Sequence, residues 1–156
     1  MHLLNLIIKK LKKIYIQEVL GLLGFFPFLL IIILSVLDKN NLSFYINFIV
    51  FYLFLIISFI GAVYWGISIS LKKKNSKLVI FSVLPSILVS VVYILKIPVT
   101  IKILIGIFFL NSIYFYEKNY CKSYLPNWYL RLRKNLNFLV TFSVLIMVII
   151  YLVCKT

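Results

Sequence analysis

The sequence predicts an all-α integral membrane protein, a bundle of five transmembrane helices whose N-terminus lies in the cytoplasm. Three observations support this prediction. The chain is 64% hydrophobic and 13% charged, whereas soluble proteins are about half apolar and about a quarter charged. Five apolar stretches are long enough to cross a bilayer. The basic residues gather in alternate connecting segments, as they do on the cytoplasmic side of membrane proteins.

The first 18 residues are expected to form a basic, amphipathic lead-in at the membrane surface, because apolar residues recur on one helical face with lysines opposite. The first span is expected over residues 19–37, about 28 Å of helix. No small-residue cleavage site follows it, so we expect it to stay uncleaved. Gly21 and Gly24 permit close packing, and Pro27 predicts a kink.

The other four spans are separated by polar or proline-containing segments and are expected at about residues 44–71, 78–95, 97–116 and 136–154. A proline disfavours helix in the residue before it, so Pro98 separates the third span from the fourth. Residues 117–135 are expected to form the longest polar connection. The chain, residues 1–156, is therefore predicted to be a single integral membrane domain.

Lysine and arginine residues predict the orientation in the membrane. The N-terminal segment and the connection after the second span carry four basic residues each, and the connection before the last span carries five. The opposite side carries four in all. The positive-inside rule places the first three segments in the cytoplasm. We expect a multi-pass protein of a bacterial inner membrane whose basic side contacts anionic lipid headgroups. Despite the net charge of +14, no soluble basic domain remains to bind nucleic acid.

Two sets of small residues recur every four positions: Ser58, Ala62, Gly66 and Ser70 in the second span, and Ser82, Ser86 and Ser90 in the third. On helices each set makes one narrow face, which predicts a close hairpin of these two spans. The serines are expected to serve packing, with their hydroxyl groups bonded one turn back. The alternative is a polar lining for a small pathway.

Three polar-capable residues, Tyr64, Trp65 and Asn111, lie deep within the second and fourth spans. Buried groups of this kind need hydrogen-bond partners, so we expect them to hold the second span against the fourth, with ligand contact as the alternative. The complete candidate motif, functional or packing, is Ser58, Gly61, Ala62, Tyr64, Trp65, Gly66, Ser82, Pro85, Ser86 and Asn111.

A second candidate site lies in the segment before the last span, which holds both arginines of the chain beside two aromatic residues suited to the headgroup layer. Glu117 lies at the C-terminal end of the fourth span, where the helix dipole disfavours an acid, so we expect it to pair with an arginine. The candidate anionic-lipid or ion-pair site is Trp128, Tyr129, Arg131, Arg133 and Glu117. The alternative is an ordinary basic anchor.

Groups for catalysis are scarce. His2 is the only histidine, and the acids are Glu18, Asp38 and Glu117, so we expect no metal site, no cofactor and no enzymatic activity. The leading hypothesis is a non-enzymatic accessory, assembly or lipid-contacting scaffold protein that binds another membrane protein. The alternative is a small-solute or ion permease or channel that acts as an oligomer. The sequence leaves the partner and the oligomeric state open.

Four blocks carry a family resemblance: LGLLGFFPF from Leu20, SFIGAVYWGISIS from Ser58, SVLPSIL from Ser82 and LPNWYLRLR from Leu125. They resemble, in order, an uncharacterised membrane-protein family, domain of unknown function 3429, which includes bacterial inner-membrane proteins and the mitochondrial transmembrane protein 69. This chain has Gly61-Ala62-Val63-Tyr64 where the family usually has Gly-Gly and a His or Arg before Trp-Gly. The resemblance implies several membrane spans and no known activity.

Overall fold

The computed structural model describes residues 16–70 and 76–155, and this part of the chain is helical without strands. The helices are α2 (Ile16–Leu23), α3 (Phe26–Leu37), α4 (Leu42–Ser70), α5 (Ser76–Ile94), α6 (Val99–Tyr120) and α7 (Asn127–Lys155), with a short 3-10 helix, η1 (Lys39–Asn41), before α4. They form five spans long and apolar enough to cross a membrane, which confirms the predicted all-α class. Apart from residues 16–18, the expected lead-in lies outside the described residues.

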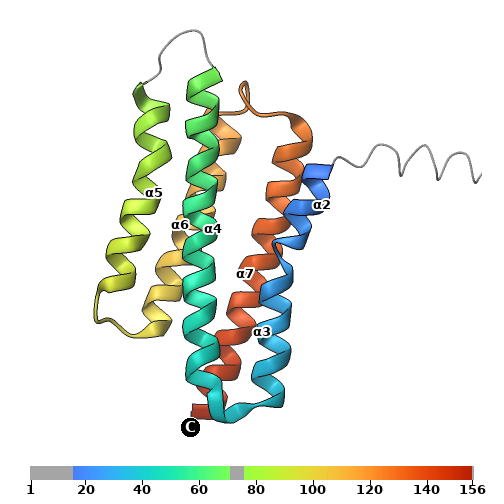
Figure 1. Ribbon diagram of the computed structural model, residues 1–156, viewed down its shortest axis with the longest axis vertical. Coiled ribbons are helices and arrows are strands. Elements are labelled where there is room, and N and C mark those ends of the chain that lie inside the picture. Colours follow the sequence, from blue (N-terminus) through green and yellow to red (C-terminus); the bar gives the residue numbers. More distant parts are fainter. Residues whose placement is uncertain (1–15, 71–75, 156) are drawn as a thin grey trace, which may run out of the picture.

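The spans stand side by side and alternate in direction (Figure 1). α4 lies in the middle of the bundle and contacts α3, α5, α6 and α7. The buried core follows its inward faces, with Ile49, Leu53 and Ile57 fully buried. We call the end of the bundle where α4 and α6 finish, and where α5 and α7 begin, the lysine-rich end.

The first span is two helices, α2 and α3, and not the single kinked helix that the sequence predicts. Pro27 has no backbone N–H, and it occupies the first turn of α3, where none is needed. The helix is interrupted just before Pro27, at Gly24 and Phe25. The break leaves the Gly24 carbonyl group without a helical donor, and the Tyr52 hydroxyl group donates to it over 2.8 Å. α4 therefore satisfies the backbone of the broken first span.

Helices α4 and α5 make the most extensive contact in the bundle, as the hairpin prediction requires, but of the expected α4 face only Ser58 lies beside α5. Ala62, Gly66 and Ser70 are exposed, and a Cβ added at Gly66 would meet nothing within 4 Å. The contact is made instead by Gly61, whose added Cβ would lie 2.6 Å from the Ser82 carbonyl oxygen. A small residue one position away from the periodic set therefore faces α5.

The α5 side of the hairpin follows the prediction more closely. Ser82 and Pro85 are buried, Ser86 is half-buried and Ser90 is exposed. The Ser82 hydroxyl group donates to the Val79 carbonyl oxygen over 2.6 Å, and that of Ser90 donates to the Ser86 carbonyl oxygen over 2.7 Å. These hydroxyl groups are satisfied within their own helix, as expected of serines that serve packing.

Helix α7 begins at Asn127, nine residues before the predicted start of the last span, so the expected polar connection over 117–135 is mostly helical. Pro126 starts this helix, because its carbonyl oxygen accepts from the N–H groups of Tyr129 and Leu130. The extra turns carry side chains that pack against α6. Only residues 121–126 connect α6 to α7.

Candidate functional site

A buried ion pair joins α6 to α7 at the lysine-rich end. Glu117 is 0% exposed and Arg133 is 6% exposed. The Arg133 Nε donates to Glu117 Oε2 over 3.1 Å and to Oε1 over 3.4 Å. The acid thus pairs with Arg133, one of the two arginines that the sequence offered. Because each charge compensates the other, both can leave water without remaining as isolated ions.

Aromatic side chains enclose this ion pair. The Tyr129 hydroxyl group donates to Glu117 Oε1 over 3.3 Å. Tyr64 reaches the pair from α4, where it is fully buried and packs edge-on against Phe81, with 5.1 Å between ring centroids. The Tyr64 hydroxyl group interacts electrostatically with Glu117 but has no hydrogen-bond partner among the described residues. Side chains from three helices, α4, α6 and α7, therefore meet at the ion pair.

Cys121 closes the cluster where α6 ends. Its backbone N–H donates to the Glu117 carbonyl oxygen over 3.2 Å, and its side chain is 1% exposed. Burial raises the pKa of the Cys121 thiol, and the Glu117 charge raises it further. The thiol is therefore neutral at physiological pH and acts as an apolar cover over the carboxylate.

A second polar contact between α6 and α7 lies deeper in the membrane. Asn111 is nine residues before the end of α6, about 14 Å along the helix axis. Its Oδ1 accepts from Asn137 Nδ2 over 2.7 Å, and its Nδ2 donates to the Ile107 carbonyl oxygen over 2.8 Å and to Thr141 Oγ1 over 3.4 Å. Asn111 is exposed and not buried as expected, and it contacts the fifth span and not the second.

The α7 side of both contacts is a single polar stripe. Tyr129, Arg133, Asn137 and Thr141 follow one another every four residues, which places them on one face of the helix. Farther along, α7 turns the apolar side chains of Val144 and Met147 into the bundle, where both are fully buried. The polar stripe therefore ends near the middle of the membrane.

Three polar atoms of this region are buried and have no hydrogen-bond partner among the described residues: Tyr64 Oη, Arg133 Nη2 and Asn137 Oδ1. Arginine often grips a carboxylate with two nitrogens. Arg133 instead presents one nitrogen, Nε, to both oxygens of Glu117, which leaves Nη2 for another partner. The cluster as a whole is charge-neutral, well enclosed and incompletely bonded.

The rest of the predicted lipid or ion-pair site lies outside this cluster. Arg131 points outward with its side chain 74% exposed, and its Nη2 lies 3.8 Å from Glu18 Oε1 on α2. Trp128 is half-buried. The two arginines thus have different environments, and Arg131 is the one that lipid headgroups can reach. Trp65 of the first candidate motif is also exposed and does not join Tyr64 in the cluster.

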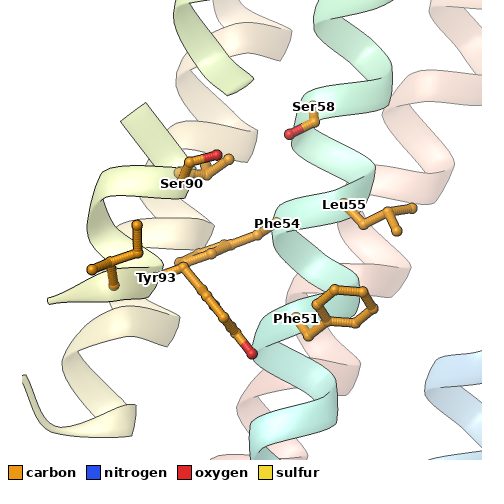
Figure 2. A pocket seen from close by; sticks show the side chains of 8 residues that line it. Phe51, Phe54, Leu55, Ser58, Ser90 and Tyr93 are labelled. Atoms are coloured by element: carbon orange, nitrogen blue, oxygen red, sulfur yellow. The ribbon is translucent and has the colours of Figure 1, made fainter. Parts of the chain in front are cut away.

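The surface of the described bundle includes two open grooves that are not lined by residues of the polar cluster. The first lies between α4 and α5 and has a volume of about 410 Å³. Figure 2 shows Ser58 and Ser90 on opposite walls of it, near the rings of Phe54 and Tyr93. The second lies at the opposite end of the bundle, where Asn47, Thr100 and Lys102 are among its lining residues. Lys102 donates from Nζ to the Tyr93 carbonyl oxygen over 2.6 Å.

Sequence reasoning missed Asn137 and Thr141, although a signal for them exists. Both fall in the last predicted span, residues 136–154, and each follows Arg133 at a multiple of four residues. Polar residues at helical spacing within a span indicate an inward face. That spacing, continued from Tyr129, identifies the stripe once the last span is extended toward its N-terminus.

The bundle and its buried ion pair define a multi-pass α-helical membrane protein. Residues 16–149 match the model of the family described as Protein of unknown function (DUF3429), and the chain belongs to this family. Comparisons with curated proteins and with solved structures gave no match.

Proposed function

We propose that this protein acts through interaction within the membrane, as a non-enzymatic accessory or assembly factor for a membrane complex or as a lipid-contacting scaffold. One observation carries the proposal. Buried polar side chains of the bundle bond within their own helix, as Ser82 does, or join helices, as Arg133 and Asn137 do. Neither groove is lined by these side chains or by Tyr64. These bonds support a role for the buried polar side chains in holding the helices together.

The proposal includes a location. We infer that the protein lies in a bacterial inner membrane with its lysine-rich end in the cytoplasm, because the basic residues concentrate there. Exposed cations at this end, such as Arg131 and Lys134, are placed to contact anionic headgroups. Reporter tags at the two ends test the orientation: the N-terminal tag is expected in the cytoplasm and the C-terminal tag outside. Both tags on one side would contradict an odd number of spans.

Photocrosslinking in native membranes tests the interaction. A crosslinking amino acid at Gly66 probes the exposed small-residue face of α4, where a partner helix can approach closely. The matched control is Phe108 on α6, which is 67% exposed. We expect a discrete protein adduct from position 66 and lipid adducts from position 108. Lipid adducts alone from both positions, with solute flux through liposomes that contain the purified protein, would replace the proposal with a permease or channel.

A further inference from the structure

Two of the unpartnered atoms, Arg133 Nη2 and Asn137 Oδ1, lie on consecutive turns of one face of α7. The two side chains belong to residues that are 6% and 5% exposed. One atom is a donor and the other an acceptor, yet they do not bond to each other or to any other described residue. A buried polar group without a partner is costly, so a pair of complementary ones on the same face indicates a common ligand.

The chemistry of these two atoms defines that ligand. It must accept a hydrogen bond from a guanidinium group and donate one to an amide oxygen. A carboxylate ion or a phosphodiester accepts only, and an ammonium ion donates only. A hydroxyl-bearing molecule does both, and water is the smallest. Neither of the two grooves described above is lined by Arg133 or Asn137, which favours the smallest such molecule.

We propose that the α7 face between Arg133 and Asn137 is a binding site for a buried water molecule, which accepts from Arg133 Nη2 and donates to Asn137 Oδ1. The water links the Glu117–Arg133 ion pair to the Asn111–Asn137 contact, so one hydrogen-bonded seam runs along α6 and α7. Buried waters commonly satisfy two to four polar groups in this way. Val144 and Met147 are buried beyond the seam, which makes the site an internal bridge and not a pathway across the membrane.

The composition of the chain makes this site accessible to NMR. Arginine occurs only at positions 131 and 133, so ¹⁵N-arginine labelling of the full chain in nanodiscs gives two guanidinium groups, and Arg131→Lys leaves one. We expect a rotating-frame Overhauser cross peak between the Arg133 Nη protons and water, opposite in sign to a chemical-exchange peak. Asn137→Leu removes the acceptor and should abolish this peak.

Asn135→Leu is the matched control, because Asn135 lies two residues away and is exposed, so the cross peak should persist. Arg133 Nη protons that show cross peaks to protein side chains and none to water would overturn the proposal. If the Nη signals are broadened beyond detection, an experimental density map decides. Density within hydrogen-bond distance of both atoms supports the site, and its absence at a resolution that shows other buried waters refutes it.

Discussion

Two helix pairs in this bundle are held together in different ways. α4 and α5 meet where Gly61 lies against the backbone of Ser82, whose hydroxyl group bonds within its own helix. α6 and α7 meet through an ion pair and an amide pair. Lipid tails are as apolar as leucine, so hydrophobic burial does not drive helices together in a bilayer. The remaining sources of association are close packing and interhelical hydrogen bonds. In this bundle, α4 and α5 associate by close packing, and α6 and α7 associate through polar contacts.

The difference predicts opposite sensitivities. The α4–α5 contact depends on the absence of a side chain, so adding an atom there should separate the helices. The α6–α7 contact depends on complementary partners, so removing one partner should leave the other buried and unpaired. Replacing both partners by apolar residues should then cost far less than replacing one.

The largest effect is expected from Glu117→Leu. This change leaves the Arg133 guanidinium group buried without its acid, and breaking a buried pair in this way costs about 3–5 kcal/mol. Reversible unfolding in mixed micelles measures the loss. The double variant Glu117→Leu/Arg133→Leu should recover most of it. A double variant as unstable as the single one would show that Glu117 stabilises the bundle without its pairing to Arg133. The ion pair would then not explain how α6 and α7 are held together.

The next effect tests the other helix pair. Gly61→Ala places a Cβ 2.6 Å from the Ser82 carbonyl oxygen, which is backbone and cannot turn aside, so we expect a loss of about 1–3 kcal/mol from overpacking. The same measurement applies. Gly66→Ala is the control on the same helix, because nothing lies within 4 Å of its added Cβ; its stability should stay unchanged or rise slightly. Equal losses at both positions would refute a specific contact at Gly61.

The sequence predicts the five spans and the choice of neighbours better than it predicts the contacting faces. Apolar length identifies each span, but charge does not fix where a helix ends, because α7 continues through Arg131, Arg133 and Lys134. The face of α4 is harder to predict, because Gly61 and the set Ser58, Ala62, Gly66 and Ser70 all have small side chains. Choosing between them requires the position of α5 relative to α4. Periodicity identifies a face that can pack and not the face that does.

The candidate site shows the same limit. The dipole argument predicts that Glu117 needs a cation, and the structure supplies Arg133. Asn111 needs a partner for its amide group, but its partners Asn137 and Thr141 lie on the fifth span and not on the second. The chemistry of a single residue shows that it needs a partner. The identity of the partner depends on which helices are neighbours, and that is a property of the whole bundle.

A smaller effect is expected from Asn111→Leu, which removes the bonds to Asn137 and Thr141. Side-chain hydrogen bonds between membrane helices average about 0.6 kcal/mol and reach about 1.7 kcal/mol, so the loss should fall in that range. Asn47→Leu is the matched control, because its Nδ2 donates only within its own helix, to the Ser43 carbonyl oxygen over 2.7 Å. A larger loss for Asn47→Leu would show that the Asn111–Asn137 hydrogen bond does not stabilise the contact between α6 and α7.

The smallest effect is expected from Arg131→Gln, which sharpens the comparison within one chemical type. Arg131 and Arg133 each face one acid, but the Arg131–Glu18 pair is 3.8 Å apart and its arginine is 74% exposed. Water and salt screen such a pair, so the change should cost about 0.2–1 kcal/mol, and less at high ionic strength. Arg133→Gln, measured in parallel, should lose several-fold more stability and depend little on salt. Equal losses with equal salt dependence would mean that burial does not change the contribution of an arginine to stability here. The Glu117–Arg133 pair would then stabilise the α6–α7 contact no more than an exposed ion pair does.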